Sequence, residues 1–177
     1  MILCVAITPS IDRLFEVARL VPGAIHRPER HVAVAGGKGL NVARAAAALG
    51  AQVRAVAPLG GHAGRWIAAE LAREGIAADV VDVPGETRSC LSVAAGGELT
   101  EFYEHAAPLG DDGWERLERA VAARLPEARW LTLSGSLPAG APPDGHARLI
   151  AAARAAGVRV AVDTHGEPLE HALRARP

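Results

Sequence analysis

A chain of 177 residues is long enough to bury a sizeable core in one or two domains. Apolar residues make up 50%, charged residues 22%, and the net charge is −1. This describes an ordinary soluble protein without the basic excess that favours nucleic acid or an anionic membrane, and with 3% aromatic residues no base-stacking platform is expected. Cys4 and Cys90 lie far apart without metal-ligand spacing, so we expect reduced, structural thiols rather than a disulfide or a zinc site.

The first predicted element is a continuous apolar run at residues 2–7, typical of a central parallel strand covered on both faces. The run is too short to span a membrane and lacks the positive segment of a signal peptide, so a cytoplasmic location is expected. Asp12 follows shortly after it. Ligands of open α/β sheets gather beyond the carboxyl ends of the strands, so Asp12 is either a ligand-contacting carboxylate or a turn-capping residue.

Residues 14–35 show no convincing helical pattern. Short apolar pieces on either side of Pro22-Gly23 predict extended segments, and an insertion of this kind is suited to a lid. Arg27 lies inside the insertion and is either a solvated surface cation or a contact for a phosphate.

The next motif is the glycine-rich stretch Ala35-Gly36-Gly37-Lys38-Gly39-Leu40-Asn41, which runs into an alanine-rich segment. The glycines permit positive φ and close approach of another group, the alanines favour a helix beginning at Asn41, and Gly50 is placed to end it. A bare turn at a helix N-terminus favours an anion or a polar ligand. The Walker A loop and the dinucleotide fingerprint both fail, because Val32 and Val42 stand where these motifs require glycine.

Strands and helices alternate beyond this motif. Strands are predicted at 53–58 and 80–83, with a helix between them that Gly75 closes, as is typical of a parallel α/β sheet. The same alternation continues towards the C-terminus. A helix from Asp111 with a core stripe precedes a strand at 130–133, and a helix at 144–156 precedes a buried strand at 158–163 and a short helix at 168–175; the stripe is Trp114, Leu117, Val121 and Leu125.

A β-hairpin interrupts this alternation. Two runs of alternating polarity, at 86–93 and 98–104, are joined through Gly96-Gly97. An antiparallel hairpin is out of place in a parallel sheet unless it belongs to a second layer. Arg88 lies near the start of the hairpin. Its guanidinium is either a solvated surface group or binds a phosphate through paired hydrogen bonds.

Two loops follow strand ends in the second half of the chain. Ser136 lies in Ser134-Gly135-Ser136-Leu137-Pro138-Ala139-Gly140, where small hydroxyl residues either line a pocket or form a tight turn. His165 lies in the other loop. No partner for it as a base can be identified, so an exposed loop histidine is expected.

The stretch Gly36-Gly37-Lys38-Gly39-Leu40-Asn41-Val42-Ala43-Arg44, followed by Leu49-Gly50, closely resembles the N-terminal signature of the PfkB (ribokinase-like) carbohydrate kinases. Within them it is most similar to the branch that phosphorylates sugar phosphates. Four shorter stretches also match this family: Thr8-Pro9-Ser10-Ile11-Asp12, Glu86-Thr87-Arg88, Ser134 to Gly140, and Asp163-Thr164-His165-Gly166.

The resemblance implies an α/β fold in which a ribokinase-like parallel sheet is flanked by helices and carries a small β-sheet lid. Residues 1–177 would be the N-terminal part of one such domain, with lid segments at about 12–34 and 87–105 and with the C-terminal part of the fold missing. It also implies a sugar-phosphate substrate, ATP and Mg²⁺ as cofactors of the full-length member, and a homodimer through the lid. The implied substrate-binding residues are Asp12, Gly36, Gly37 and Asn41 for hydroxyls, Lys38, Arg88 and Arg27 for the phosphate, and Ser136 as a neighbour.

Two motifs of the family do not occur in the chain. The Lys-Pro-Asn-x-x-Glu element would follow Pro177, and no Gly-x-Gly-Asp string, which carries the general base in relatives, is present. We therefore expect no catalytic residue and no metal ligand within residues 1–177. We also expect this chain by itself to be inactive, and poorly stable unless a partner covers the sheet edge.

The function favoured by the resemblance is phosphorylation of a ketohexose phosphate by ATP. Fructose 1-phosphate is the first choice, tagatose 6-phosphate the second and fructose 6-phosphate the third. One alternative is a non-catalytic sugar-phosphate-binding protein. Another, a Rossmann-like nucleotide-binding domain, is weakened by the failed fingerprint and the out-of-place hairpin.

Overall fold

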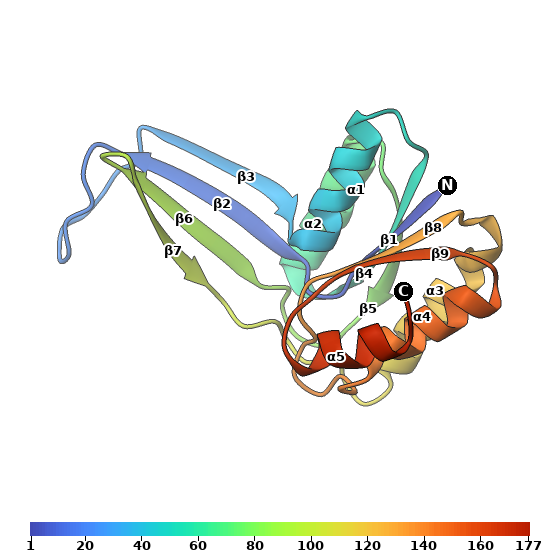
Figure 1. The fold of residues 1–177 in the computed structure, drawn as a ribbon. Coiled ribbons are helices and arrows are strands. Elements are labelled where there is room, and N and C mark those ends of the chain that lie inside the picture. Colours follow the sequence, from blue (N-terminus) through green and yellow to red (C-terminus); the bar gives the residue numbers. More distant parts are fainter.

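The structure is a computed structural model that describes residues 1–177, and its centre is a sheet of five parallel strands (Figure 1). The strands lie in the order β5-β4-β1-β8-β9. Their bounds are Ile2–Ala6 for β1, Val53–Leu59 for β4, Ala77–Asp82 for β5, Trp130–Ser134 for β8 and Arg159–Asp163 for β9. The predicted parallel α/β sheet is therefore confirmed.

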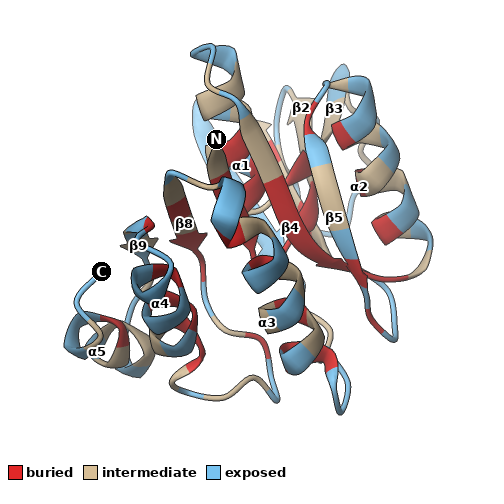
Figure 2. Cartoon of the chain, turned by 90° about the vertical axis from the view of Figure 1, so that its right-hand side faces the viewer, coloured by how far each residue is buried: buried red, intermediate tan, exposed pale blue.

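Helices cover both faces of this sheet. One face carries α1 (Lys38–Ala48) and α2 (Gly61–Arg73), and the other carries α3 (Gly113–Arg124), α4 (Gly145–Ala155) and α5 (Glu167–Arg174). A single turn of 3₁₀-helix, η1 (Leu125–Glu127), follows α3. Figure 2 shows buried residues along β4 and β8, while the outer sides of the helices are exposed.

The central strand β1 supplies both halves of the core. Side chains alternate across a strand, so Leu3 and Val5 face the layer of α3 and α4, while Cys4 and Ala6 face the layer of α1 and α2. All four are almost completely buried. The continuous apolar run at the N-terminus is thus explained by a strand that is covered on both faces.

A second, smaller sheet extends away from the helices (Figure 1). It has the order β3-β2-β6-β7, with bounds Ser10–Val17 for β2, Arg30–Gly36 for β3, Ser89–Ala95 for β6 and Glu98–Tyr103 for β7. The pairs β2–β3 and β6–β7 are antiparallel, whereas β2 pairs with β6 in parallel. The predicted hairpin and its association with the early insertion are confirmed.

Two helix predictions are confirmed at the level of single residues. Gly50 follows α1 with φ of 82°, a left-handed conformation that glycine adopts without strain. The stripe of α3 is buried at Trp114, Leu117 and Val121, and Leu125 is buried just after it. No helix is both long enough and apolar enough to cross a membrane.

Three details differ from the sequence predictions. Helix α1 begins at Lys38 rather than Asn41, because Gly39 lets the first turn approach β1; a Cβ at this position would lie 2.5 Å from the Cα of Ala6. Strand β5 begins at Ala77 rather than at residue 80. Strand β9 alternates between exposed and half-buried residues instead of being buried, because it is an edge strand paired only with β8.

Candidate functional site

A polar cavity of about 260 Å³ lies where the two sheets meet. The strand order of the central sheet reverses at β1: the chain first adds β4 and β5 on one side of β1 and then adds β8 and β9 on the other side. The carboxyl ends of strands at such a switch point are where α/β proteins bind ligands. The lining residues come from both sheets: Thr8, Ser10, Asp12, Gly37, Lys38, Asn41, Arg88, Cys90, Tyr103, Gly135, Ser136 and His165.

The carboxylate of Asp12 is held in a fixed position on β2. Its Oδ1 accepts a hydrogen bond from the Ser10 hydroxyl at 2.6 Å, and its Oδ2 accepts one from the backbone N–H of Gly37 at 3.2 Å. Gly36 leaves the space that the carboxylate fills, because a Cβ there would lie 2.1 Å from the Asp12 carboxyl carbon. The glycine pair and Asp12 therefore form one unit, with unused lone pairs of the carboxylate available to a ligand hydroxyl.

The N-terminus of α1 opens into this cavity. Gly37 precedes the helix with φ of 87°, and no side chain caps the first turn. The first N–H groups of a helix lack internal partners and carry a partial positive charge, which favours an anionic or polar ligand. The Lys38 ammonium adds a full positive charge and forms an ion pair with Asp163 at 3.0 Å.

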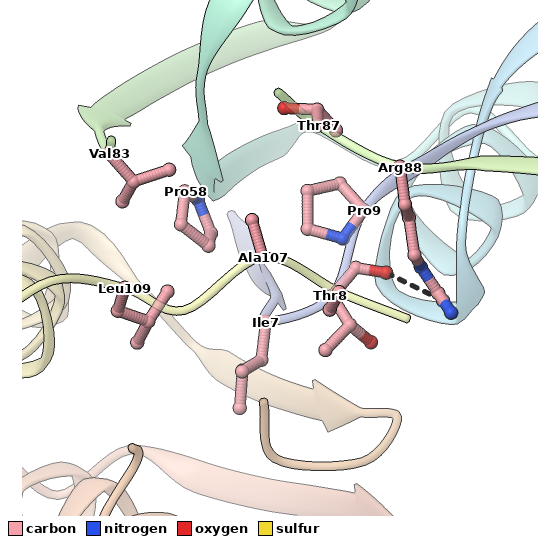
Figure 3. Close-up of a pocket in the computed structure, with 10 residues that line it drawn as sticks. Ile7, Thr8, Pro9, Pro58, Val83, Thr87, Arg88, Ala107 and Leu109 are labelled. Atoms are coloured by element: carbon pink, nitrogen blue, oxygen red, sulfur yellow. Dashed lines mark hydrogen bonds between the residues drawn. The ribbon is translucent and has the colours of Figure 1, made fainter. Parts of the chain in front are cut away.

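Arg88 adds a second positive charge to the lining of the cavity. Its Nη2 donates to the carbonyl oxygen of Thr8 at 3.1 Å (Figure 3), and its Nη1 donates to that of Glu104 at 3.2 Å. Its Nε is buried without a partner. The guanidinium is therefore anchored by two carbonyls and remains positively charged, with donors to spare for a ligand anion.

The segment that carries Arg88 is itself anchored to the central sheet. The buried Thr87 hydroxyl accepts from the Gly60 N–H at 2.9 Å and donates to the Gly60 carbonyl at 3.1 Å. On its other side Arg88 borders a small, largely apolar pocket that includes Pro9, Pro58 and Leu109 (Figure 3). These contacts fix the start of β6 relative to β4 and so fix the position of Arg88.

The structure brings together most of the residues that the sequence singled out. Asp12, Gly37, Lys38, Asn41, Arg88 and Ser136 all line the cavity, and Gly36 lies directly behind Asp12. Arg27 is not among the lining residues; it is exposed in the connection between β2 and β3, at the outer end of the second sheet (Figure 1).

Six lining residues were not assigned to a site by sequence reasoning: Thr8, Ser10, Cys90, Tyr103, Gly135 and His165. Cys90 and Tyr103 are paired across the hairpin, and Cys90 in turn pairs with Asp12, so the strand register carries all three to the cavity. The strand register that a turn at Gly96-Gly97 implies could have indicated that Cys90 lies opposite Tyr103. His165 is exposed, as predicted, but it lies at the cavity because it follows the carboxyl end of β9.

The two hairpin residues that line the cavity, Cys90 and Tyr103, are ionisable and are held in their neutral forms. Burial raises the pKa of the Cys90 thiol above its ordinary value, which disfavours the thiolate. The pKa of Tyr103 is raised chiefly by the hydrogen bond that its hydroxyl donates to Glu101 at 2.6 Å. Neither residue is activated as a nucleophile or base, so their contribution to the site is shape and hydrogen bonding.

The fold and the cavity define a class of protein. A helix-flanked parallel sheet, a small accessory sheet and a polar site between them, at the switch point, form part of a ribokinase-like fold. Residues 1–176 match the family described as pfkB family carbohydrate kinase. The chain belongs to this family.

Individual relatives agree with the family assignment. The chain is 42% identical over 177 residues to a 1-phosphofructokinase from Xanthomonas campestris pv. campestris, covering 98% of this chain and 55% of the relative. Among solved structures it is similar to the tetrameric inhibited form of phosphofructokinase-2 from Escherichia coli, with a TM-score of 0.88, 35% identity, and 98% and 57% of the two chains covered. A possible 1-phosphofructokinase from Thermotoga maritima gives a TM-score of 0.91 at 26% identity, covering 98% of this chain and 56% of that one.

The chain thus spans little more than half the length of these relatives. The part that it shares with them is the part that contains the cavity between the two sheets.

Proposed function

We propose that the cavity binds a ketohexose phosphate and that the chain provides the sugar-binding part of an ATP-dependent sugar-phosphate kinase. The observation that carries the proposal is the convergence of Lys38, Arg88 and the uncapped α1 N-terminus on one cavity that also holds the fixed carboxylate of Asp12. Cations and helix N–H groups suit a phosphate, and a carboxylate suits sugar hydroxyls. A ligand with both kinds of group matches both kinds of lining residue.

In this proposal each residue has a separate role. Asp12 accepts hydrogen bonds from sugar hydroxyls, and Gly37 and Asn41 complete the contact with the sugar. Lys38 and Arg88 bind the phosphate, Lys38 as a point charge and Arg88 through its planar fork of donors. Ser136 lines the cavity beside them.

The reaction that we propose for the whole kinase is transfer of the γ-phosphoryl group of ATP to a hydroxyl of the sugar phosphate. Fructose 1-phosphate is the favoured substrate, followed by tagatose 6-phosphate and fructose 6-phosphate; one relative is named a 1-phosphofructokinase. ATP and Mg²⁺ would supply the phosphoryl group and charge neutralisation. No group of three or more His, Cys, Asp or Glu in this chain is placed to hold a metal ion. The role that we derive for the cavity residues is to bind and orient the acceptor sugar.

Isothermal titration calorimetry tests the proposal. The chain is titrated with fructose 1-phosphate, tagatose 6-phosphate, fructose 6-phosphate, unphosphorylated fructose and ATP. We expect the sugar phosphates to bind more tightly than fructose, and Lys38→Ala and Arg88→Ala to weaken the phosphorylated ligands far more than fructose. Equal loss for both kinds of ligand would rule out the phosphate role of these two residues.

The same titrations separate the kinase from a non-catalytic binding protein. For residues 1–177 alone we propose binding without turnover, because they contain no Gly-x-Gly-Asp string. Turnover of ATP and fructose 1-phosphate by these residues at an ordinary kinase rate would contradict this. In a longer chain, ATP binding and phosphorylation support the kinase, whereas sugar-phosphate binding without ATP binding supports the non-catalytic alternative.

We further propose that two copies associate through the second sheet. The strand register places Leu14, Val32, Val34 and Leu99 on one face of it, the same face as Asp12. Leu99 is 57% exposed, and apolar side chains that share an exposed sheet face are typical of an interface.

A further inference from the structure

Arg44, near the middle of α1, is the most heavily hydrogen-bonded side chain next to the cavity, although it does not line the cavity itself. Its Nε and Nη2 bind both carboxylate oxygens of Glu74, at 3.0 and 3.3 Å. Its Nη2 also donates to the carbonyl oxygen of Ala35, the residue before Gly36. Glu74 directly follows α2, so the guanidinium links α1, α2 and the end of β3.

The remaining nitrogen of Arg44 contacts a residue of the cavity. Its Nη1 donates to Oδ1 of Asn41 at 3.0 Å. The two residues are three positions apart on α1 and therefore lie on one side of the helix. Arg44 side-chain exposure is 31% and that of Glu74 is 21%, so the pair is shielded more than most ion pairs of the chain.

This contact decides the orientation of the Asn41 amide. A guanidinium has only donors, so the atom of Asn41 that faces it must be the oxygen. The amide nitrogen is then directed away from Arg44, and it has no hydrogen-bond partner within the chain. The free amide nitrogen of Asn41 can therefore donate a hydrogen bond to an oxygen atom of a ligand in the cavity.

We propose that Arg44, held in place by Glu74, is a positioning residue that orients the Asn41 amide so that its nitrogen donates to the ligand in the cavity. The identity of the ligand as a sugar phosphate rests on the proposed function, but the orientation of Asn41 does not. Arg44 contributes to stability as well, since it joins two helices. The proposal therefore predicts an effect on binding beyond the effect on stability.

The chain offers a matched control for the structural part. Arg124 makes a similar bidentate pair with Asp79, at 2.7 and 2.9 Å, and its side-chain exposure of 34% is close to that of Arg44. Neither member of this pair lines the cavity. Arg124→Met should lower the thermal stability as Arg44→Met does and leave ligand affinity unchanged.

The first test is a double-mutant cycle on the affinity for fructose 1-phosphate. Arg44→Met and Asn41→Ala are each expected to weaken binding roughly three- to tenfold, the range of one hydrogen bond. The double variant should bind no more weakly than Asn41→Ala alone. Arg44→Lys serves as the variant that folds well, because a lysine can pair with Glu74 but cannot hold Asn41 and Ala35 at the same time. Additive losses in the double variant, or unchanged affinity in Arg44→Lys, would overturn the proposal.

The second test needs no ligand. The side-chain NH₂ signals of Asn41 in a ¹H–¹⁵N spectrum are identified by their loss in Asn41→Ala. They are expected to shift in Arg44→Lys and to stay unchanged in Arg124→Met; no shift in Arg44→Lys would overturn the proposal. If the wild-type chain binds no sugar phosphate at all, the proposed function fails. The spectrum still shows whether Arg44 orients the Asn41 amide, because it needs no ligand.

Discussion

The ammonium of Lys38 lies 3.0 Å from Oδ2 of Asp163. The two residues are 125 positions apart in the sequence and meet because the first residue of α1 and the last residue of β9 reach the same edge of the central sheet. Both side chains are about 60% exposed. The charge proposed to bind the substrate phosphate is therefore paired with a carboxylate of the chain itself.

The first prediction is that Asp163→Asn tightens the binding of sugar phosphates. The substitution removes a competing partner of Lys38 and a negative charge that repels the phosphate. Exposed ion pairs are weak, so we expect an improvement of up to about fivefold, decreasing as salt is added. Calorimetry with fructose 1-phosphate measures it, and the affinity for unphosphorylated fructose is the control. Weaker phosphate binding in Asp163→Asn would mean that the carboxylate contacts the ligand instead.

The second prediction concerns the space beside Asp12. Gly36→Ala would place a Cβ 2.1 Å from the carboxyl carbon of Asp12, so the carboxylate must move. We expect the affinity for the sugar to fall roughly 10- to 100-fold, as for the loss of a hydrogen bond to a charged group. The control is the Asp12→Ala background, in which the clash is absent and Gly36→Ala should cost nothing further. A further loss in that background would place the defect in the backbone of the loop.

Local signals in the sequence predicted most of the fold. The apolar run at 2–7 gave the central strand, the glycine pair at 96–97 gave the hairpin, and the spacing of Trp114, Leu117 and Val121 gave the buried side of α3. Each of these depends on residues close together in the chain. The family resemblance supplied what such signals cannot, namely that the hairpin and the early insertion form one sheet.

Contacts between distant segments could not be predicted in this way. The pairing of Arg44 with Glu74 depends on how α1 packs against the end of α2, and the exposure of β9 depends on the order of strands in the sheet. The start of α1 was placed three residues too late, because the close approach of Gly39 to β1 is a tertiary contact. Six of the proposed site residues nevertheless line one cavity, since family motifs at strand ends converge where the strands do.

The third prediction tests association through the second sheet. Leu99→Glu should convert a dimer to a monomer, because it replaces an apolar contact by a further charge on the sheet face that also carries Leu14 and Val32. Phe102→Glu is the matched control: Phe102 is also 57% exposed and lies on the same strand, but on the opposite face. Sedimentation equilibrium measures the mass of each variant. A wild-type monomer, or dissociation by Phe102→Glu but not by Leu99→Glu, would contradict the proposed face.

The fourth prediction concerns His146, which is completely buried near the start of α4. Neither ring nitrogen has a hydrogen-bond partner. Burial lowers its pKa below the ordinary value of 6.5 and outweighs the Gly135 backbone, which acts in the opposite direction. Below pH 6.5 the unfolded chain therefore binds a proton that the folded chain does not. The free energy of unfolding should fall as the pH drops from 6.5 towards the lowered pKa, by up to about 1.4 kcal/mol per pH unit.

Urea unfolding of the wild type and of His146→Leu between pH 7.5 and pH 5.5 measures this contribution. The leucine variant cannot take up the proton, so the wild type should lose stability relative to it as the pH falls, whichever of the two is more stable at pH 7.5. His105→Leu, at an exposed loop position, is the control for the exchange of histidine for leucine itself. Parallel profiles for the wild type and His146→Leu would show that His146 takes up its proton equally in the folded and unfolded chain, which a buried imidazole without partners should not do.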